Sequence, residues 1–310
     1  MSLCIGILGA RRTRNGLGPF LAQHLEAAGA RVVAVGGRDA AGAGAAAAAL
    51  ADLLGHEVGA HGSVHELCRS GIDALVIASP PETHADALEA ALAARLPTLC
   101  EKPLVESRET DRGLALVDGF DRAGVLLVEN CQWPFVLPAL HALHPQLAGA
   151  DPRSLRMRLS PSQPGPGMVA DSLSHLLSVA QALAAVWGDT EACDVALAPL
   201  GADGLHLRLT LASGASRLHC ALELVPCPAQ PRPAWVEVDG CRMEREIGPG
   251  YAIQFRAGDR VVSAPDPMRE LVYRFASLAQ HPVDEPRRAE SRRIRERARL
   301  FGHVVRCCEG

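Results

Sequence analysis

Residues 73–104 have the sequence DALVIASPPETHADALEAALAARLPTLCEKPL. Two short apolar runs, Asp73–Ser79 and Pro97–Glu101, enclose a stretch with helical spacing over Thr83–Leu96. Apolar strands separated by a helix are typical of a parallel sheet, because parallel neighbours need a long crossover connection. This stretch therefore predicts a strand–helix–strand unit with a right-handed crossover.

The same alternation continues on both sides of this unit. The expected strands are Cys4–Gly9, Arg31–Gly36, a weak one near Val58 and Val125–Asn130, and the expected helices are Pro19–Ala28, 40–54, Val64–Cys68 and Glu109–Gly124. We therefore predict an α/β fold whose first domain, residues 1–130, is a doubly wound Rossmann sheet covered by helices on both faces.

The pattern changes after residue 130. One helix is expected at 168–187, and two more at 267–280 and 286–306 close the chain. Strand-like stretches separated by turns rich in Gly, Pro and Asp occur at 154–160, 193–199, 204–212, 215–225, 234–239 and 252–256. Consecutive strands with short turns indicate a mainly antiparallel sheet. Residues 131–310 are thus expected to form a second, α+β domain.

The composition excludes several classes of protein. The chain has 310 residues, 48% hydrophobic and 21% charged, with a formal net charge of −4, which is typical of a globular protein with little attraction for nucleic acid. No apolar run reaches the roughly 18 residues of a membrane helix, and no leader pattern is seen, so we expect a cytoplasmic protein without a membrane partner. Its ten cysteines include no CxxC pair, and no metal site is expected.

Lys102 is the only lysine among 31 basic residues. Arginine replaces lysine easily on a solvated surface, but not where a compact ammonium must fit a pocket or exchange a proton. Lys102 follows the strand Pro97–Glu101, at the sheet edge where open α/β folds bind ligands. We therefore take Lys102 as a catalytic candidate, with chance retention as the alternative, and expect a cis peptide bond before Pro103.

Glycines and arginines cluster between the first strand and the first helix. Gly9, Gly16 and Gly18 stand where a dinucleotide-binding chain turns tightly toward a pyrophosphate, although their G-x6-G-x-G spacing is unusual. Arg11 and Arg12 add positive charge that suits a phosphorylated ligand. An exposed polar loop is the alternative interpretation.

The second strand ends in Gly36-Gly37-Arg38, without the carboxylate that usually bonds the ribose 2′-hydroxyl of NAD. An arginine can pair with a 2′-phosphate, so Arg38 favours NADP, whereas the adjacent Asp39 keeps NAD possible. Farther along, Asp171, His175 and Ser178 lie at i, i+4 and i+7 of an otherwise apolar helix. A carboxylate and an imidazole on one face can exchange a proton with a substrate hydroxyl, but a solvent-facing pair fits equally well.

The block Asp73–Leu104, which contains Glu-Lys-Pro, and the later segment ADSLSHLL (Ala170–Leu177) resemble the glucose-fructose oxidoreductase / inositol dehydrogenase / MocA-like (Gfo/Idh/MocA) oxidoreductases. The resemblance implies an N-terminal Rossmann domain and a C-terminal domain whose open-faced sheet serves oligomer contacts. Residues 131–310 would then be a substrate and oligomerisation domain, in a homo-oligomer such as a dimer or tetramer. Leu173 and Ser178 depart from the family pattern, which loosens any inference of a polyol substrate.

The resemblance also implies site residues. A nicotinamide cofactor would lie along the first loop and Arg38, and further cofactor contacts would come from Ser79, Pro80, Pro81, Glu101 and Lys102. Lys102, Asp171 and His175 would form the catalytic group, with His175 exchanging the proton and Lys102 polarising the substrate oxygen. His84 would cap a helix or contact a ligand. Asn130 and Trp133 would line the substrate site, with domain-interface packing as the alternative for Trp133.

These expectations combine into one leading hypothesis and two alternatives. The leading hypothesis is an oxidoreductase that uses NADP, or NAD, to transfer a hydride to or from a small hydroxyl or carbonyl compound such as a sugar or polyol. The first alternative is a non-catalytic sensor of a dinucleotide or metabolite with the same fold. The second is a nicotinamide-dependent enzyme that causes no net redox change or reduces an imine.

Overall fold

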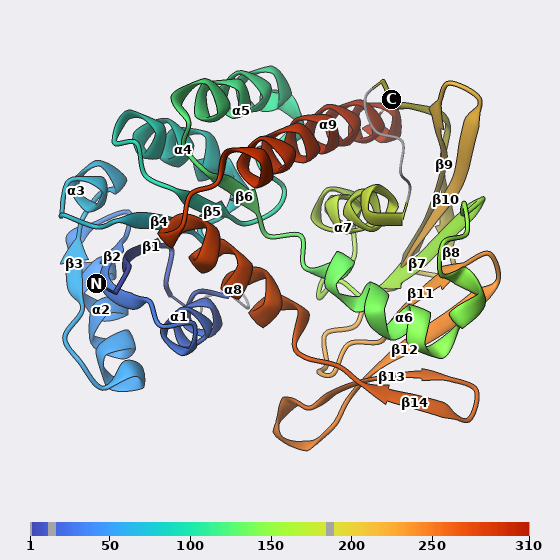
Figure 1. Cartoon of the computed structure of the whole chain (residues 1–310), viewed down its shortest axis with the longest axis horizontal. Coiled ribbons are helices and arrows are strands. Elements are labelled where there is room, and N and C mark those ends of the chain that lie inside the picture. The colour runs from blue at the N-terminus through green and yellow to red at the C-terminus, as the bar shows by residue number, and fades with distance from the viewer. Residues whose placement is uncertain (1, 12–16, 184–188, 310) are drawn as a thin grey trace. The chain divides into compact units, whose positions relative to one another are not determined.

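A computed structural model describes residues 2–11, 17–183 and 189–309, and the chain divides into two compact units (Figure 1). The first unit comprises Met1–Asn130 and Met268–Arg295, and the second comprises Cys131–Pro267 and Glu296–Gly310. The first unit thus takes in a C-terminal segment that the sequence pattern alone grouped with the second domain.

The first unit is built on a six-stranded parallel sheet with the strand order β3-β2-β1-β4-β5-β6. The strands are β1 (Cys4–Leu8), β2 (Arg31–Gly36), β3 (Gly59–His61), β4 (Ala74–Ile77), β5 (Thr98–Cys100) and β6 (Leu127–Glu129). Every residue of β4, β5 and β6 is buried, as a parallel sheet covered on both faces requires. This order is that of a Rossmann sheet and confirms the predicted fold class.

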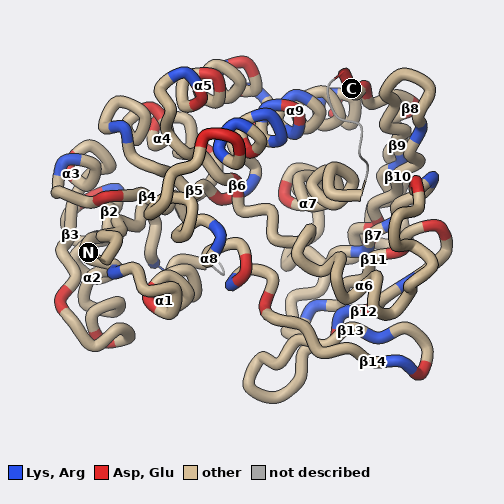
Figure 2. Tube along the Cα trace, in the orientation of Figure 1, with Lys and Arg blue, Asp and Glu red and all other residues tan. Residues whose placement is uncertain are grey.

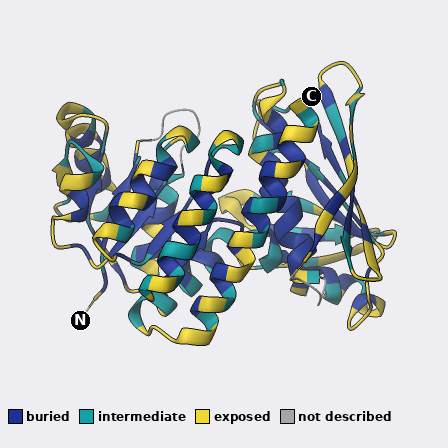
Figure 3. Ribbon diagram, turned by 90° about the horizontal axis from the view of Figure 1, so that it is seen from above, coloured by how far each residue is buried: buried dark blue, intermediate teal, exposed yellow. Residues whose placement is uncertain are grey.

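Helices follow the strands of this sheet in the predicted alternation. They are α1 (Gly18–Ala27), α2 (Ala40–Leu54), α3 (Val64–Cys68), α4 (His84–Ala93) and α5 (Thr110–Ala123), with short 3₁₀ turns η1 (Pro81–Thr83) and η2 (Ser107–Glu109). Each longer helix carries a buried stripe on one side and an exposed stripe on the other (Figure 3). The buried stripe faces the sheet, and the exposed stripe is polar in α5 but mostly alanine in α2.

Two C-terminal helices complete the chain, α8 (Pro267–Gln280) and α9 (Asp284–Glu309). Acidic and basic residues alternate along α9 (Figure 2). Within the first unit, Arg287 pairs with Asp121 at 2.7 Å and Arg295 pairs with Asp118 at 2.8 Å, which ties α9 to α5. The arginine-rich run is therefore a salt-bridged helix face.

The second unit contains an eight-stranded sheet with the order β14-β13-β12-β11-β7-β10-β9-β8. The strands are β7 (Ser154–Leu159), β8 (Glu191–Leu200), β9 (Gly204–Ser213), β10 (Ser216–Leu224), β11 (Ala234–Val238), β12 (Cys241–Ile247), β13 (Ile253–Ala257) and β14 (Arg260–Ser263). Only the β7–β10 pair is parallel. The mainly antiparallel sheet was predicted, but β12 and β14 were not.

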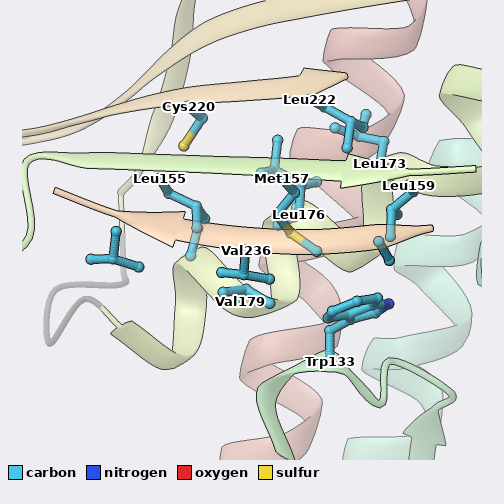
Figure 4. Packing of buried hydrophobic residues seen from close by; sticks show 14 of the residues in the cluster. Trp133, Leu155, Met157, Leu159, Leu173, Leu176, Val179, Cys220, Leu222 and Val236 are labelled. Atoms are coloured by element: carbon cyan, nitrogen blue, oxygen red, sulfur yellow. The ribbon is translucent and has the colours of Figure 1, made fainter. Parts of the chain in front are cut away.

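One face of this sheet packs on helix α7 (Gly167–Leu183) (Figure 4). Alternate residues of β7 point toward this core, and α7 supplies Leu173, Leu176 and Val179 to it. The same core includes the end of α9 and the short elements η3 (Trp133–Val136), α6 (Leu137–Leu143) and η4 (Pro145–Leu147). Helix α7 is buried around most of its circumference, and this burial includes polar side chains such as Ser172, Ser174 and Gln181.

The other face of the sheet carries an ordered layer of charges around Trp235. Side chains of alternating sign are linked by ion pairs in the order Arg158, Glu223, Arg156, Glu237 and Arg242. Three of these guanidinium groups lie over the Trp235 ring, Arg242 at 4.0 Å from its centroid. This network covers an aromatic side chain that would otherwise be exposed. None of the helices in the described ranges is long and apolar enough to cross a membrane.

Candidate functional site

The turn after β1 lies against the end of β4. Gly9 has φ of +83°, and a Cβ atom at this position would lie 2.6 Å from the Cα of Ser79. A Cβ at Gly18, the first residue of α1, would lie 2.6 Å from the Cα of Ala10. Only glycine permits these approaches, so the two glycines fit the close backbone packing expected of a dinucleotide-binding turn.

The remainder of that loop is only partly described. Arg12 and Gly16, both expected to contact the cofactor, lie outside the described residues. At the start of α1, Leu17 provides no side-chain cap and the first turn has no acidic residue. The positive end of the helix dipole is therefore not neutralised by the helix's own side chains.

The end of β2 is positively charged. Asp39 caps helix α2, and its Oδ1 accepts a hydrogen bond from the Gly42 N–H at 2.6 Å. Arg38 beside it is exposed. The Nη1 atom of Arg11 reaches the same place, 3.5 Å from where a Cβ on Gly42 would stand. The competing carboxylate is thus engaged in a helix cap, while two arginines belong to the loops on either side of it.

The turn Ser79–Pro81 is held by its own hydrogen bonds. The Oγ of Ser79 lies 2.6 Å from Oγ1 of Thr83, which also donates to the carbonyl of Pro80 at 2.8 Å. Pro80 is exposed, while Ser79 and Pro81 are half-buried. The turn therefore offers a fixed surface at the carboxyl end of β4.

Lys102 follows β5 and is half-buried, and its peptide bond to Pro103 is cis, as predicted. His84 is completely buried nearby, with Nδ1 2.9 Å from the carbonyl oxygen of Pro103 and Nε2 2.8 Å from that of Ser79. Burial lowers the pKa of His84, against the opposing effect of these carbonyl contacts. His84 is therefore a link between the two loops, because both ring nitrogens face the backbone.

A buried polar group supports the residue before Lys102. Asn130, which is 1% exposed, donates from Nδ2 to Oε1 of Glu101, and its N–H donates to the carbonyl of Cys100 at 2.7 Å. Glu129 is also buried and accepts a hydrogen bond from the N–H of Leu104 at 3.1 Å. These contacts fix the backbone on both sides of Lys102. They give Asn130 an orienting function toward Glu101 that the sequence did not reveal.

The other expected catalytic residues belong to the second unit. On α7, Asp171 is exposed and His175 is buried. Ser178 donates from Oγ to the carbonyl of His175 at 2.8 Å, so its hydroxyl is used within the helix. The polar stripe expected on α7 is therefore limited to the Asp171–His175 pair. Lys102 lies in the first unit, and the assembly of all three into one catalytic group stays a prediction.

Trp133 is buried in the core of the second unit, where the guanidinium carbon of Arg245 lies 5.5 Å from its ring centroid. Sequence reasoning missed Arg245 and its neighbour Arg232. The alternation in strand β12 places Arg245 on the same face as the buried Met243, but that strand itself was not predicted.

Residues 3–130 match the sequence profile of an oxidoreductase family described as having an NAD-binding Rossmann fold. The profile is that of the Gfo/Idh/MocA oxidoreductases, and the matched residues make up less than half of the chain. This match agrees with the strand order and with the glycine contacts after β1.

Characterised proteins with similar sequences match about a third of the chain. An inositol 2-dehydrogenase from Rubrobacter xylanophilus is 37% identical over 113 residues, which are 36% of this chain and 30% of that protein. Inositol 2-dehydrogenase 1 from Saccharopolyspora erythraea is 43% identical over 100 residues, which are 32% of this chain and 26% of that protein. The matched segment thus spans less than a third of each of these two relatives.

Solved structures of similar fold match along nearly the whole chain. UDP-N-acetylglucosamine 3-dehydrogenase from Acidithiobacillus ferrooxidans has a TM-score of 0.68 at 21% identity, covering 100% of both chains. A 3-ketoreductase from Actinomadura kijaniata, in complex with TDP-benzene and NADP, has a TM-score of 0.65 at 20% identity, covering 97% of this chain and 96% of that one. At this identity the likeness establishes the fold of both units.

Proposed function

We propose that this protein is an NADP-dependent oxidoreductase that transfers a hydride between the nicotinamide and a small hydroxyl or carbonyl substrate, with sugars and polyols as the first candidates. The carboxyl edge of the first sheet carries this proposal. There Gly9 leaves no room for a Cβ against the Ser79 backbone, which is the close glycine turn that a dinucleotide-binding strand–helix connection needs.

The charges at the end of β2 support NADP over NAD. A 2′-phosphate needs cationic partners, and Arg11 and Arg38 belong to the two loops next to the α2 N-terminus. The carboxylate nearest to this place, Asp39, is held in the α2 cap by the Gly42 N–H, which engages its Oδ1. In this proposal Gly9, Gly18 and the Ser79–Pro81 turn contact the rest of the cofactor.

The chemistry divides between the cofactor and three side chains. When bound, the nicotinamide supplies or accepts the hydride. Lys102 donates a hydrogen bond from its ammonium to the reacting substrate oxygen. His175 exchanges the proton of that oxygen, and Asp171 orients the imidazole or the substrate. Glu101, held by Asn130, fixes the approach of Lys102.

The proposal includes the cellular location and the oligomeric state of the enzyme. We place it in the cytoplasm as a homo-oligomer, a dimer or a tetramer, with the second unit providing both substrate contacts and subunit contacts. Its outward sheet face bears the charge layer around Trp235, which is polar enough to remain solvated in a free subunit.

The test is a screen for substrate-dependent change in NADPH absorbance with sugars, polyols and their keto forms. The wild-type protein should turn over at least one of them, and Lys102→Ala and His175→Ala should lose about 10²–10⁴-fold in kcat. Saturable NADPH binding without turnover of any compound in the screen would instead favour a non-catalytic sensor.

A further inference from the structure

Two arginines of the second unit form no salt bridge with a described residue. Arg232 and Arg245 form no ion pair with any residue in 2–11, 17–183 or 189–309. By contrast, Arg256 on the adjacent strand β13 is held by both carboxylate oxygens of Glu246, at 2.6 and 3.1 Å. An arginine without a carboxylate is unremarkable in water but not in a protein interior.

Arg245 points toward the interior. Its strand position is opposite Ala234 on β11 and Phe255 on β13, both buried, so it shares the core face of the sheet with Met243. Its Nε atom is buried and has no hydrogen-bond partner among the described residues. The ring of Trp133, 5.5 Å away, packs on the guanidinium and holds it in place.

Arg232 brings a second charge to the same place. Its backbone carbonyl accepts a hydrogen bond from Nη2 of Arg245 at 2.9 Å. Burial is the main cause that lowers the pKa of Arg245, and the charge of Arg232 adds a smaller lowering. The Nε atom of Arg232 is likewise buried, with no partner in the part of the chain that the structure describes. Each of these two neighbouring arginines thus has a buried Nε–H without a hydrogen-bond partner among the described residues.

Burying the guanidinium of Arg245 costs free energy unless an anion pairs with it. Burial lowers the pKa of Arg245, but an arginine remains protonated at any physiological pH, so the charge persists. Tyr251 and Asp266 act in the opposite direction and raise that pKa, but burial outweighs them. The residues that the structure does not describe, 1, 12–16, 184–188 and 310, include no Asp or Glu side chain.

We propose that Arg232 and Arg245 form an oxyanion subsite that binds the carboxylate or phosphate group of a small molecule, with Trp133 as its apolar wall. Planar guanidinium groups bind both anions through paired N–H donors, which would satisfy the two orphaned Nε atoms. Identifying that small molecule as the substrate rests on the proposed function. The enzyme would then act on a hydroxyl or carbonyl compound that also carries an acidic group.

The experiment is a calorimetric and thermal-unfolding titration of the full chain with inorganic phosphate, and separately with malonate, at ionic strength held constant with sodium chloride. The wild-type protein should bind at least one of the two anions saturably and show a higher Tm. Arg232→Gln and Arg245→Gln should each weaken that binding about tenfold or more. Arg256→Gln is the matched control, since it removes a paired arginine from the neighbouring strand, and it should bind as the wild type does.

Preference between the two probes distinguishes a phosphorylated from a carboxylated ligand. An equal rise in Tm in all four proteins would be the general stabilisation that phosphate gives by exclusion from surfaces, and it would overturn the proposal. So would the absence of any anion effect in the wild type combined with strong destabilisation in both arginine variants, because the arginines would then serve the fold alone.

The apo proteins give a further readout that does not depend on the ligand. Without a bound anion, the buried charge of Arg245 destabilises the fold in this proposal. Arg245→Gln removes that charge, so the variant should unfold at no lower temperature than the wild type. NADPH binding, measured in the same samples, separates the two proposals. If the wild-type protein binds NADPH but neither anion, only the subsite is overturned, whereas if it binds an anion but not NADPH, only the proposed function is overturned.

Discussion

The carboxylate of Asp39 accepts a hydrogen bond from the N–H of Gly42 at 2.6 Å and so caps helix α2. In many NAD enzymes a carboxylate near this position bonds the ribose instead. Because Asp39 is engaged in the cap, the loop should discriminate between cofactors through its arginines. Arg38→Ala and Arg11→Ala should each weaken NADPH binding about tenfold and leave NADH binding nearly unchanged. Nicotinamide fluorescence titrations measure both affinities.

Asp39→Ser is the control for this prediction, since serine also caps helices well and carries no charge. It should preserve both the fold and the affinity for NADH. A large loss of NADH affinity in Asp39→Ser, with normal NADPH binding in Arg38→Ala, would show that Asp39 is a ribose ligand and that the enzyme uses NAD.

Gly9 should tolerate no side chain. A Cβ there meets the backbone of Ser79 at 2.6 Å, and the residue has a positive φ. Gly9→Ala is expected to destabilise the protein by about 3 kcal/mol and to abolish dinucleotide binding. Gly44→Ala is the matched control, because Gly44 lies in helix α2 with no atom within 4 Å of its Cβ position. It should stabilise the protein by up to about 1 kcal/mol. Urea unfolding measures both.

The free energy of unfolding should depend on pH near neutrality through protonation of His84. Its pKa is lowered from the ordinary 6.5, mainly by burial, so the unfolded chain binds this proton more readily than the folded one. The stabilisation that the neutral imidazole provides is complete above pH 6.5 and is lost as the pH falls through the folded pKa. His84→Leu removes two carbonyl contacts and should destabilise the protein by about 2–3 kcal/mol at pH 7.5, and by less at pH 5.

The measurement is the free energy of unfolding of wild type and His84→Leu at these two pH values. If the difference in unfolding free energy between the two proteins were larger at pH 5 than at pH 7.5, the buried imidazole would be protonated in the folded state. His84→Leu should also reduce kcat, because His84 contacts the carbonyl of Pro103, next to Lys102.

Glu223 should contribute to acid sensitivity in the second unit. Burial alone would raise its pKa, but the ion pairs with Arg158 and Arg156 outweigh burial and lower it below the ordinary 4.5. Its stabilising effect is therefore present above pH 4.5 and is lost as the pH falls through the folded pKa. Glu223→Gln should destabilise the protein by about 1–2 kcal/mol at pH 7, with the difference vanishing in acid. Glu246→Gln, which breaks an exposed pair, should have little effect.

The fold of the first unit was predictable because buried parallel strands are continuous apolar runs. Asp73–Ser79 stood out in this way, and the structure has β4 at Ala74–Ile77. Strand β12 was not predicted because its sequence, CRMEREI, is rich in charged residues. Tertiary contacts stabilise these charges in the sheet. Arg242, for example, pairs with Glu237 and lies over the Trp235 ring, and the local sequence pattern does not reveal such contacts.

The candidate site was predictable where composition or backbone geometry left a signal. Lys102 was conspicuous as the single lysine, and Gly9 was conspicuous at the end of a strand. The supporting contacts were not predictable, because Asn130 reaches Glu101 only through the pairing of β5 with β6. Likewise, a capping Asp39 and a ribose-binding Asp39 look the same in the sequence.

The most direct test of the central claim is a titration of the purified protein with NADPH and, separately, NADH, followed by nicotinamide fluorescence and tryptophan quenching. Saturable binding with NADPH the tighter of the two, and loss of that preference in Arg38→Ala, is the predicted result. If neither nucleotide binds at millimolar concentration, the first unit does not hold a nicotinamide dinucleotide and the proposed oxidoreductase activity is contradicted.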